Sequence, residues 1–377
     1  MSAAPTASPE NTFLAQGKKR EQPLGRLAWA NNSGSPLTLD VRNVGYLDRL
    51  ALVTIMTGTY TTAGPTAVDG MGQYSGPISR IAVRSNSTGV LYDVTGFAMA
   101  IISAITNDYN NGSATFAPAP STFTAAPALA AFTDKWAYEI PIGIYLANYE
   151  APLGLYQTAI QGQETQIEIR WSSIAINTAA IGTGVYVGNS ANLTVGPTAY
   201  TDIQQIYYEP IDRKWANALP NQSFVHTWTD TYYPITADGD NEFRLPAANM
   251  YLRLILILVT GATAATLALD SNTPTRFRVT YGANITPFDW TNDQLRYRMS
   301  KQYPHITFPA GVFIVDLLSE THTERDWLNS AASTELRLII TTASGSYAGG
   351  AYLRVVKEQL VPYIVPTPGS VGVQGVN

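Results

Sequence analysis

The sequence predicts an all-β protein made of two similar halves, and the composition gives the first reason. Of the 377 residues, 45% are hydrophobic and 14% are charged, so the chain has enough apolar material for a packed core and is not disordered along its whole length. The 29 glycines and 23 prolines, mixed with Thr, Ser and Asn, favour short strands and turns over long helices. A formal charge of −5 argues against a dedicated nucleic-acid-binding protein.

Short runs that alternate apolar and polar side chains, or that are rich in β-branched residues, predict strands along both halves. In the first half these runs cover residues 37–44, 47–56, 80–85, 165–171 and 202–208. In the second half they cover residues 251–260, 276–281, 311–318, 334–340 and 352–360. Only two helices are expected: one at 96–105, after Thr95, and one at 291–301, with Thr291 or Asn292 as its N-cap.

The two halves repeat one another in order, and this is the most informative feature of the sequence. The matched pairs are 46–50 with 251–254, 79–83 with 275–279, the two helices, Pro141-x-Gly143 with Pro309-x-Gly311, 165–169 with 334–338, and the last strands around Glu209 and Glu358. Each copy then holds about eight strands and one short helix, which is the size of a jelly roll. The predicted fold is therefore two consecutive eight-stranded jelly rolls, each with one short helix. The alternative is one large sandwich or barrel with coincidental matches.

The repeat also predicts the domain boundaries. Residues 1–34 read as an N-terminal arm, 35–212 as the first roll, 213–363 as the second roll and 364–377 as a C-terminal tail. The first roll carries long low-complexity insertions, at residues 58–76, 107–131 and 172–200. Residues 35–212 hold 13 acidic and 6 basic residues, whereas residues 213–363 hold 13 of each. Two similar modules with different surfaces suit two similar but non-identical places in an assembly.

No motif points to catalysis, a cofactor or a metal. The chain has no cysteine, which excludes disulfides, zinc–cysteine sites and thiol nucleophiles, and it has no P-loop. His226 and His322 are interpreted as structural residues, and the acidic run 238–242 as a turn rather than a calcium loop. The longest weakly polar stretch, residues 254–269, is shorter than the roughly 20 residues that a membrane-spanning helix needs. We therefore assign no catalytic, cofactor or metal site.

A family resemblance enters through the second half of the sequence. The segments HITFPAGVFIVDLL, TELRLIITTASG and LRVVKEQLVPY, together with the order of the repeats, resemble the major capsid proteins of tailless icosahedral viruses that have a double jelly-roll fold. Bacteriophages with an internal membrane, such as tectiviruses and corticoviruses, are the nearest comparison by size and composition. The resemblance covers about residues 35–363 and is one of pattern and order, without a signature motif.

The resemblance implies a structural protein of a virion and not an enzyme. Such proteins form homotrimers whose two rolls per chain make a pseudo-hexagonal capsomer. The capsomers contact one another and a vertex (penton) protein, and assembly would take place in the host cytoplasm. The basic run Lys18, Lys19 and Arg20 would face an internal lipid membrane or the genome. No cofactor and no small-molecule substrate are implied.

Two other classes of function remain open at this point. A carbohydrate-binding β-sandwich, such as a spike or lectin, would need aromatic side chains clustered on one face. A β-sandwich glycoside hydrolase would need a cleft with two facing carboxylates. Neither arrangement is visible in the sequence, because both arise only in three dimensions.

Overall fold

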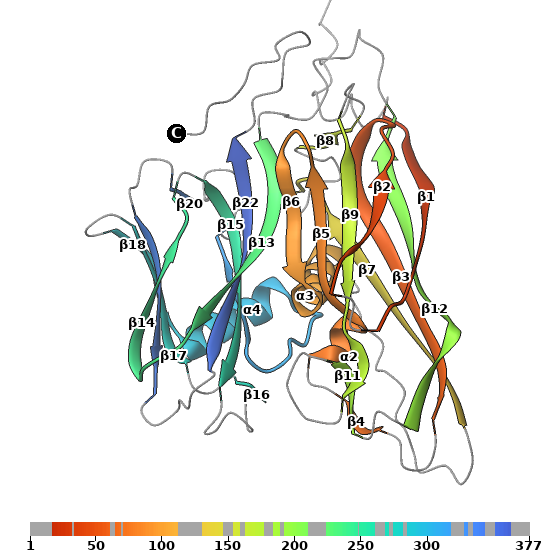
Figure 1. Ribbon diagram of the computed structural model, residues 1–377. Helices are drawn as coiled ribbons and strands as arrows, with labels where there is room; N and C mark the ends of the chain where they lie inside the picture. The colour runs from red at the N-terminus through yellow and green to blue at the C-terminus, as the bar shows by residue number, and fades with distance from the viewer. Residues whose placement is uncertain are drawn as a thin grey trace, which may run out of the picture.

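The computed structural model describes residues 17–31, 34–60, 65–68, 71–111, 130–145, 154–158, 163–176, 184–188, 192–209, 224–247, 249–260, 268–270, 274–281, 285–317, 328–330, 335–343 and 351–362. Within these ranges the chain forms two sandwiches of antiparallel strands that stand side by side (Figure 1). The predicted linker between the rolls, from 210 to 223, and the predicted C-terminal tail lie outside the described residues.

The first sandwich uses strands from the N-terminal half. One sheet has the order β1 (Lys19–Ala28), β12 (Leu193–Tyr208), β3 (Tyr46–Tyr60) and β7 (Ala130–Pro141). The other has the order β2 (Leu37–Val41), β9 (Thr165–Trp171), β5 (Ile78–Ser85) and β6 (Gly89–Thr95). The additional short elements are β4 (Pro65–Val68), α2 (Gly72–Ser75), β8 (Tyr156–Gln157), β10 (Ser173–Ile176) and β11 (Gly184–Gly188).

The second sandwich uses strands from the C-terminal half. Its first sheet has the order β13 (Phe224–Pro234), β22 (Tyr352–Pro362), β15 (Met250–Thr260) and β19 (Val312–Asp316). Its second sheet has the order β14 (Gly239–Leu245), β21 (Leu336–Thr342), β17 (Pro274–Tyr281) and β18 (Ile285–Thr291). Two short strands also pair with β15, namely β16 (Ala268–Leu269) and β20 (Leu328–Asn329).

The two sandwiches have the same topology. When the eight principal strands of each are counted in chain order, one sheet reads first, eighth, third, sixth and the other reads second, seventh, fourth, fifth, in both halves. A helix follows the fifth strand in each half: α3 (Gly96–Asn111) after β6, and α4 (Asn292–Gln302) after β18. The predicted fold of two eight-stranded jelly rolls, each with one short helix, is confirmed.

One sheet runs through both rolls. Strand β6, the fifth strand of the first roll, pairs in parallel with β13, the first strand of the second roll, through Trp228–Tyr92 and Thr229–Asp93. This pairing joins two four-stranded sheets into one continuous sheet. Trp228 and Tyr92 are fully buried, and one hydrophobic cluster contains side chains of both rolls. The rolls are therefore held together by backbone pairing as well as by apolar contacts.

Most of the repeat matches fall on equivalent strands, but two are wrong. The match of Glu209 with Glu358 is out of register, because Glu358 pairs with Arg253 whereas Ile206 pairs with Arg49. The segments at 46–50 and 251–254 lie on the third strands, and those at 79–83 and 275–279 lie on the fourth. The segment 165–169 and residues 336–338 of its match lie on the seventh. Pro141, however, ends β7, whereas Pro309 precedes β19. The register shows the error, because Arg49 pairs with Pro141 while Arg253 pairs with Asp316. A short Pro-x-Gly motif marks a turn in both places, at opposite ends of the sixth strand.

The prediction of an N-terminal arm over residues 1–34 is wrong for the part that the structure describes. Residues 19–28 form β1, an edge strand that pairs along its whole length with β12. Leu27 is its only buried side chain, and Pro23 and Gly25 flank a shift in register, so the alternation that predicts strands is missing. Residues 1–16 lie outside the described residues.

The predicted insertions of the first roll also contain regular elements. Strand β4 and helix α2 lie within 58–76, while β10, β11 and the first half of β12 lie within 172–200. These segments are rich in Thr, Ala and Gly, so their composition hides the pattern of a strand. The middle of the insertion at 107–131 lies outside the described residues.

Candidate assembly interface

The predicted site residues lie at the start of β1. The Lys19 ammonium is 2.9 Å from the buried Asp48 carboxylate, and Arg20 Nε is 2.9 Å from Glu209 Oε1. The carbonyl of Lys18 accepts a hydrogen bond from the Glu209 N–H. Two of the three cations are therefore paired within the chain. Their expected role toward a membrane or a genome stays a prediction.

Asp48 belongs to a charged cluster in the first roll. Arg49 binds Asp48 at 3.1 Å and Glu139 at 2.7 Å, and the Tyr145 hydroxyl donates to Asp48 at 2.5 Å. Burial lowers the pKa of the Arg49 guanidinium, but the two carboxylates outweigh this, so its pKa lies above the ordinary value. Burial and the nearby Asp48 carboxylate raise the pKa of Tyr145. These contacts tie the start of β1 to strands β3 and β7.

A second cluster lies in the second roll, where it meets the first. Arg253 bridges Glu358 at 2.9 Å and Asp316 at 3.3 Å, and all three side chains are buried. Burial raises the pKa of Glu358, but Arg253 and His226 reverse that effect and the net pKa is lowered. His226 Nε2 lies 2.9 Å from Glu358, and its Nδ1 lies 3.3 Å from the carbonyl of Ile142 in the first roll. The structural interpretation of His226 thus agrees with its contacts.

A chain of charges crosses the pairing of β6 with β13. Asp230, on β13, is 3.1 Å from Arg80 and 3.2 Å from Arg354, and it accepts a hydrogen bond from the Thr95 N–H at 2.9 Å. Arg80 also binds Asp93 of β6 at 2.6 Å. The Asp230 side chain is 1% exposed, so it is a buried carboxylate that binds groups of both rolls. We call the β6–β13 pairing with this charge chain the roll junction.

The second roll has the same arginine–aspartate pair as the β6 side of the roll junction, but on the open edge strand β18. Arg276 and Asp289 stand in the same places as Arg80 and Asp93, because Arg80 pairs with Thr95 and Arg276 pairs with Thr291 at equivalent ends of the fourth and fifth strands. Arg276 binds Asp289 through both carboxylate oxygens, at 2.5 and 2.6 Å. Strand β18 ends its sheet, and no described strand pairs with its outer side.

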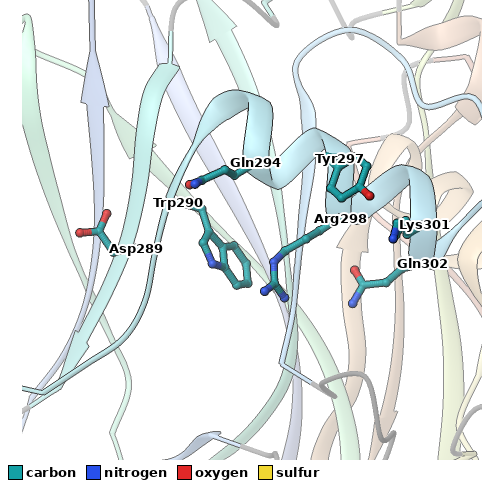
Figure 2. Close-up of a pocket in the computed structure, with 7 residues that line it drawn as sticks. All are labelled: Asp289, Trp290, Gln294, Tyr297, Arg298, Lys301 and Gln302. Atoms are coloured by element: carbon teal, nitrogen blue, oxygen red, sulfur yellow. The ribbon is translucent and has the colours of Figure 1, made fainter.

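A hollow of about 740 Å³ lies beside this open edge, between β18 and α4 (Figure 2). Phe288 stacks on Trp290 with the ring centroids 4.7 Å apart, and the Arg298 guanidinium lies 4.5 Å from the Trp290 ring. The Tyr297 side chain is 60% exposed. The hollow is lined by Asp289, Trp290, Gln294, Tyr297, Arg298, Lys301 and Gln302.

These groups suit a contact surface better than a reaction site. The hollow has one carboxylate, Asp289, and that carboxylate is paired with Arg276, so it lacks the two facing carboxylates of a glycosidase. The Trp290 ring is already in contact with Phe288 and Arg298, so it is not a free platform for a sugar. Aromatic and arginine side chains are enriched in protein–protein interfaces.

The described residues also show no metal site or membrane span. Within them, no three His, Asp or Glu side chains converge as ligands for a metal ion. In the acidic run 238–242, Asp240 instead binds Arg278 and the Thr341 hydroxyl. None of the helices in the described ranges is long and apolar enough to cross a bilayer. His322 lies outside the described residues.

Comparison with known proteins identifies the fold and not the sequence family. No protein-family model matches the chain, and no curated protein sequence matches it. The crystal structure of the STIV MCP is similar over 95% of this chain and 100% of its own, with a TM-score of 0.66 and 11% identity. A chain of the atomic structure of Sulfolobus Turreted Icosahedral Virus is similar over 92% of this chain and 91% of its own, with a TM-score of 0.65 and 14% identity.

A third structure, PBCV-1 VP54 fitted into a reconstruction of the virophage Sputnik, is similar over 91% of this chain and 94% of its own. Its TM-score is 0.60 and its identity to this chain is 9%. At such identities the similarity establishes a shared fold. The double jelly roll expected from the sequence is therefore the fold of this chain, over nearly its whole length.

Proposed function

We propose that this protein is a major capsid protein that builds the shell of an icosahedral virus. The observation that carries the proposal is the repeated topology: two jelly rolls of identical strand order stand side by side and share one sheet. The fold is common to the STIV MCP over the whole of that chain. A single roll would serve many functions, whereas two matched rolls in one chain favour a building block with repeated contacts.

The proposed building block is a homotrimer. Three chains with two similar rolls each place six similar sectors around a threefold axis, which makes a pseudo-hexagonal capsomer. Such capsomers would contact one another and a vertex protein in the virion shell, after assembly in the host cytoplasm. The low fraction of charged residues, 14%, supports large contacts between chains.

The N-terminal basic run has a narrower role in this proposal than the sequence indicated. Lys19 and Arg20 are paired with Asp48 and Glu209, so Lys18 and the residues before it would make the contact with an internal membrane or the genome. We also propose that the protein has no enzymatic activity and no small-molecule substrate. No contact of the described residues favours the carbohydrate-binding alternative.

The test is the mass of the purified native protein by light scattering on a sizing column, followed by electron microscopy. The proposal predicts a stable species of about 122 kDa, three times the chain mass of 40.8 kDa, with a pseudo-hexagonal outline and a tendency to form shells. A monomer at every protein and salt concentration would contradict it.

A further inference from the structure

The counterparts of the two strands that form the roll junction lie at sheet edges with no strand partner among the described residues. Each roll has its first strand at the edge of one sheet and its fifth strand at the edge of the other. Inside the chain, the fifth strand of the first roll, β6, pairs with the first strand of the second roll, β13. The remaining fifth strand, β18, and the remaining first strand, β1, end their sheets, and no described strand covers either outer edge.

We propose that β18 of one copy pairs in parallel with β1 of a second copy, repeating the roll junction between chains. The partner is thus another copy of this chain, and the inference rests on the proposed capsomer. Figure 1 shows β1 and β18 on opposite sides of the molecule. A contact between opposite sides is head-to-tail, and head-to-tail contacts close into a ring when the rotation allows it.

The edge of β18 already has the groups that the junction uses at β6. Arg276 and Asp289 form the same pair of fourth-strand arginine and fifth-strand aspartate as Arg80 and Asp93. In the roll junction, Arg80 has a second carboxylate partner, Asp230 of the neighbouring roll. The Arg276 side chain is 52% exposed, so it is accessible to a carboxylate of another chain.

The register of the proposed contact on β1 follows from the eighth strands, β12 and β22, because each pairs with both the first and the third strand of its roll. Glu358 pairs with both Arg253 and Trp228, and Ile206 pairs with both Arg49 and Glu21. Because Arg49 and Arg253 occupy the same place on the third strands, Glu21 is the counterpart of Trp228. It follows that Gln22 is the counterpart of Thr229 and Pro23 that of Asp230. The nearest carboxylate on β1 is therefore Glu21, two residues before the Asp230 position.

This register predicts which residues meet across the new junction. Trp228 and Thr229 pair with Tyr92 and Asp93 inside the chain. The counterparts on β18 are Phe288 and Asp289, so Glu21 of one copy pairs with Phe288 of the other, and Gln22 pairs with Asp289. Pro23, the next residue, has no N–H to donate, which limits the ladder to a short run. The roll junction is equally short, with two pairs.

Charge complementarity supports the same pairing. Glu21 is exposed, and its carboxylate has no ion-pair partner among the described residues. The opposite edge carries Arg276, and α4 beside it adds Arg298 and Lys301 at the hollow. The cations of β1, Lys19, Arg20 and Arg26, are paired with Asp48, Glu209 and Asp202 within the chain. The Glu21 carboxylate therefore remains for the cationic edge of the next copy.

Disulfide trapping tests the proposal on the full-length protein, because the natural chain has no cysteine. In the double variant Gln22→Cys/Asp289→Cys, mild oxidation should link chains to one another, up to three, in a form that reductant reverses. The matched control is Gln22→Cys/Thr286→Cys, whose second cysteine is three residues away, about 10 Å along the strand. We expect about tenfold more interchain disulfide in the first variant, since a disulfide needs Cα atoms within about 7 Å.

A charge reversal gives a second test that needs no cysteine. Glu21→Arg places a cation on the same face of β1 as the position that would meet Arg276, two residues along the strand, so it should shift the oligomer toward monomer without changing the melting temperature of the monomer. Glu164→Arg makes the same change at another exposed acid of the first roll and should leave the oligomer intact.

The outcomes separate this inference from the proposed function. Light scattering on the same samples first establishes whether an oligomer is present. A trimer that forms no more disulfide in the Asp289 variant than in the Thr286 control, or that tolerates Glu21→Arg, overturns the pairing and leaves the capsomer standing. A protein that is always monomeric overturns both.

Discussion

The two helices that follow the fifth strands occupy the same place in the two rolls, yet their surroundings differ. In α3 every residue from 96 to 105 is buried, whereas α4 buries only Leu295 and Met299. Helix α4 instead has an N-terminal capping box at Thr291 and exposes Tyr297, Arg298 and Lys301. The helix after the fifth strand is thus interior in the first roll and surface in the second, as the proposed pairing between copies requires.

The first residue of each helix shows how the sequence produces this difference. A Cβ added at Gly96 would lie 1.9 Å from the carbonyl oxygen of Ile78, so only glycine lets α3 approach strand β5 this closely. The equivalent residue of α4 is Asn292, whose side-chain amide donates to the carbonyl of Pro274 at 2.8 Å. The first helix lies directly against its sheet, and the second is held by a side-chain bridge.

The largest effect is expected from Gly96→Ala. The added methyl group must displace the backbone of β5 or α3, which we expect to cost on the order of 3 kcal/mol of unfolding free energy. The control is Asn292→Ala, which removes one side-chain hydrogen bond and should cost about 1 kcal/mol. Urea unfolding followed by circular dichroism measures both. Equal losses for the two variants would contradict the different packing of the helices.

The second-largest loss of unfolding free energy is expected from Asp230→Asn, because Asp230 is the buried carboxylate of the roll junction. An amide satisfies Arg80 and Arg354 less well, and both arginines are partly exposed, so solvent compensates in part. We expect a loss of about 2 kcal/mol. Asp289→Asn changes the counterpart of Asp93, on the open edge, and should leave the unfolding curve of the monomer unchanged. If Asp289→Asn were the more damaging variant, the roll junction would not be the place where the rolls are held.

The buried Glu358 should make stability depend on acid pH. Its pKa is below the ordinary value of 4.5 because Arg253 and His226 outweigh burial, so its ionised form stabilises the fold above that value. This contribution is lost as the pH falls through the lowered pKa of the folded state. The gap in melting temperature between the wild type and Glu358→Gln should therefore be largest at neutral pH and close below about pH 4.

Glu335 provides the comparison for this pH dependence. The hydrogen bond with Arg337 lowers its pKa too, but the pair is partly open to solvent, which screens it. Glu335→Gln should follow the wild type at every pH. A gap that widens toward acid for Glu358→Gln would show that the carboxylate does not stabilise the fold in its ionised form.

The smallest effect on stability is expected at Tyr297, which is 60% exposed. Tyr297→Ala should leave the melting temperature of the monomer unchanged but weaken the oligomer, because the side chain lies on the face of α4 that the next copy would cover. Tyr297→Phe keeps the aromatic surface and should assemble like the wild type. Sedimentation velocity across a concentration series distinguishes them. An alanine variant that assembles normally would place the contact elsewhere.

The sequence predicted the fold class well because the repeat is carried by buried strands. The matches at 46–50, 79–83 and 165–169 lie on inner strands, where alternation follows burial. Strand β1 was missed because an edge strand with one buried side chain has no such pattern. The Pro-x-Gly match failed because a turn motif marks a chain reversal without saying which end of a strand it follows.

The candidate interface was harder to predict than the fold. The basic run Lys18, Lys19 and Arg20 stood out in the sequence, yet two of its members have partners 29 and 189 residues away. The roll junction depends on Asp230 and Arg80, which are separated by 150 residues. The sequence feature that pointed toward the interface was the similarity of residues 79–83 to residues 275–279, which places Arg80 and Arg276 on equivalent strands. That similarity did not indicate which of the two fifth strands pairs with another strand of the same chain.

The most direct test of the proposed capsomer is a cryo-electron microscopy map of the intact native oligomer at a resolution that traces strands. We expect three chains in a closed ring, with β18 of each chain parallel to β1 of the next and Gln22 opposite Asp289. A ring whose contacts leave the outer edges of β1 and β18 uncovered would contradict the pairing between chains. A preparation that contains only monomers would contradict the capsomer itself.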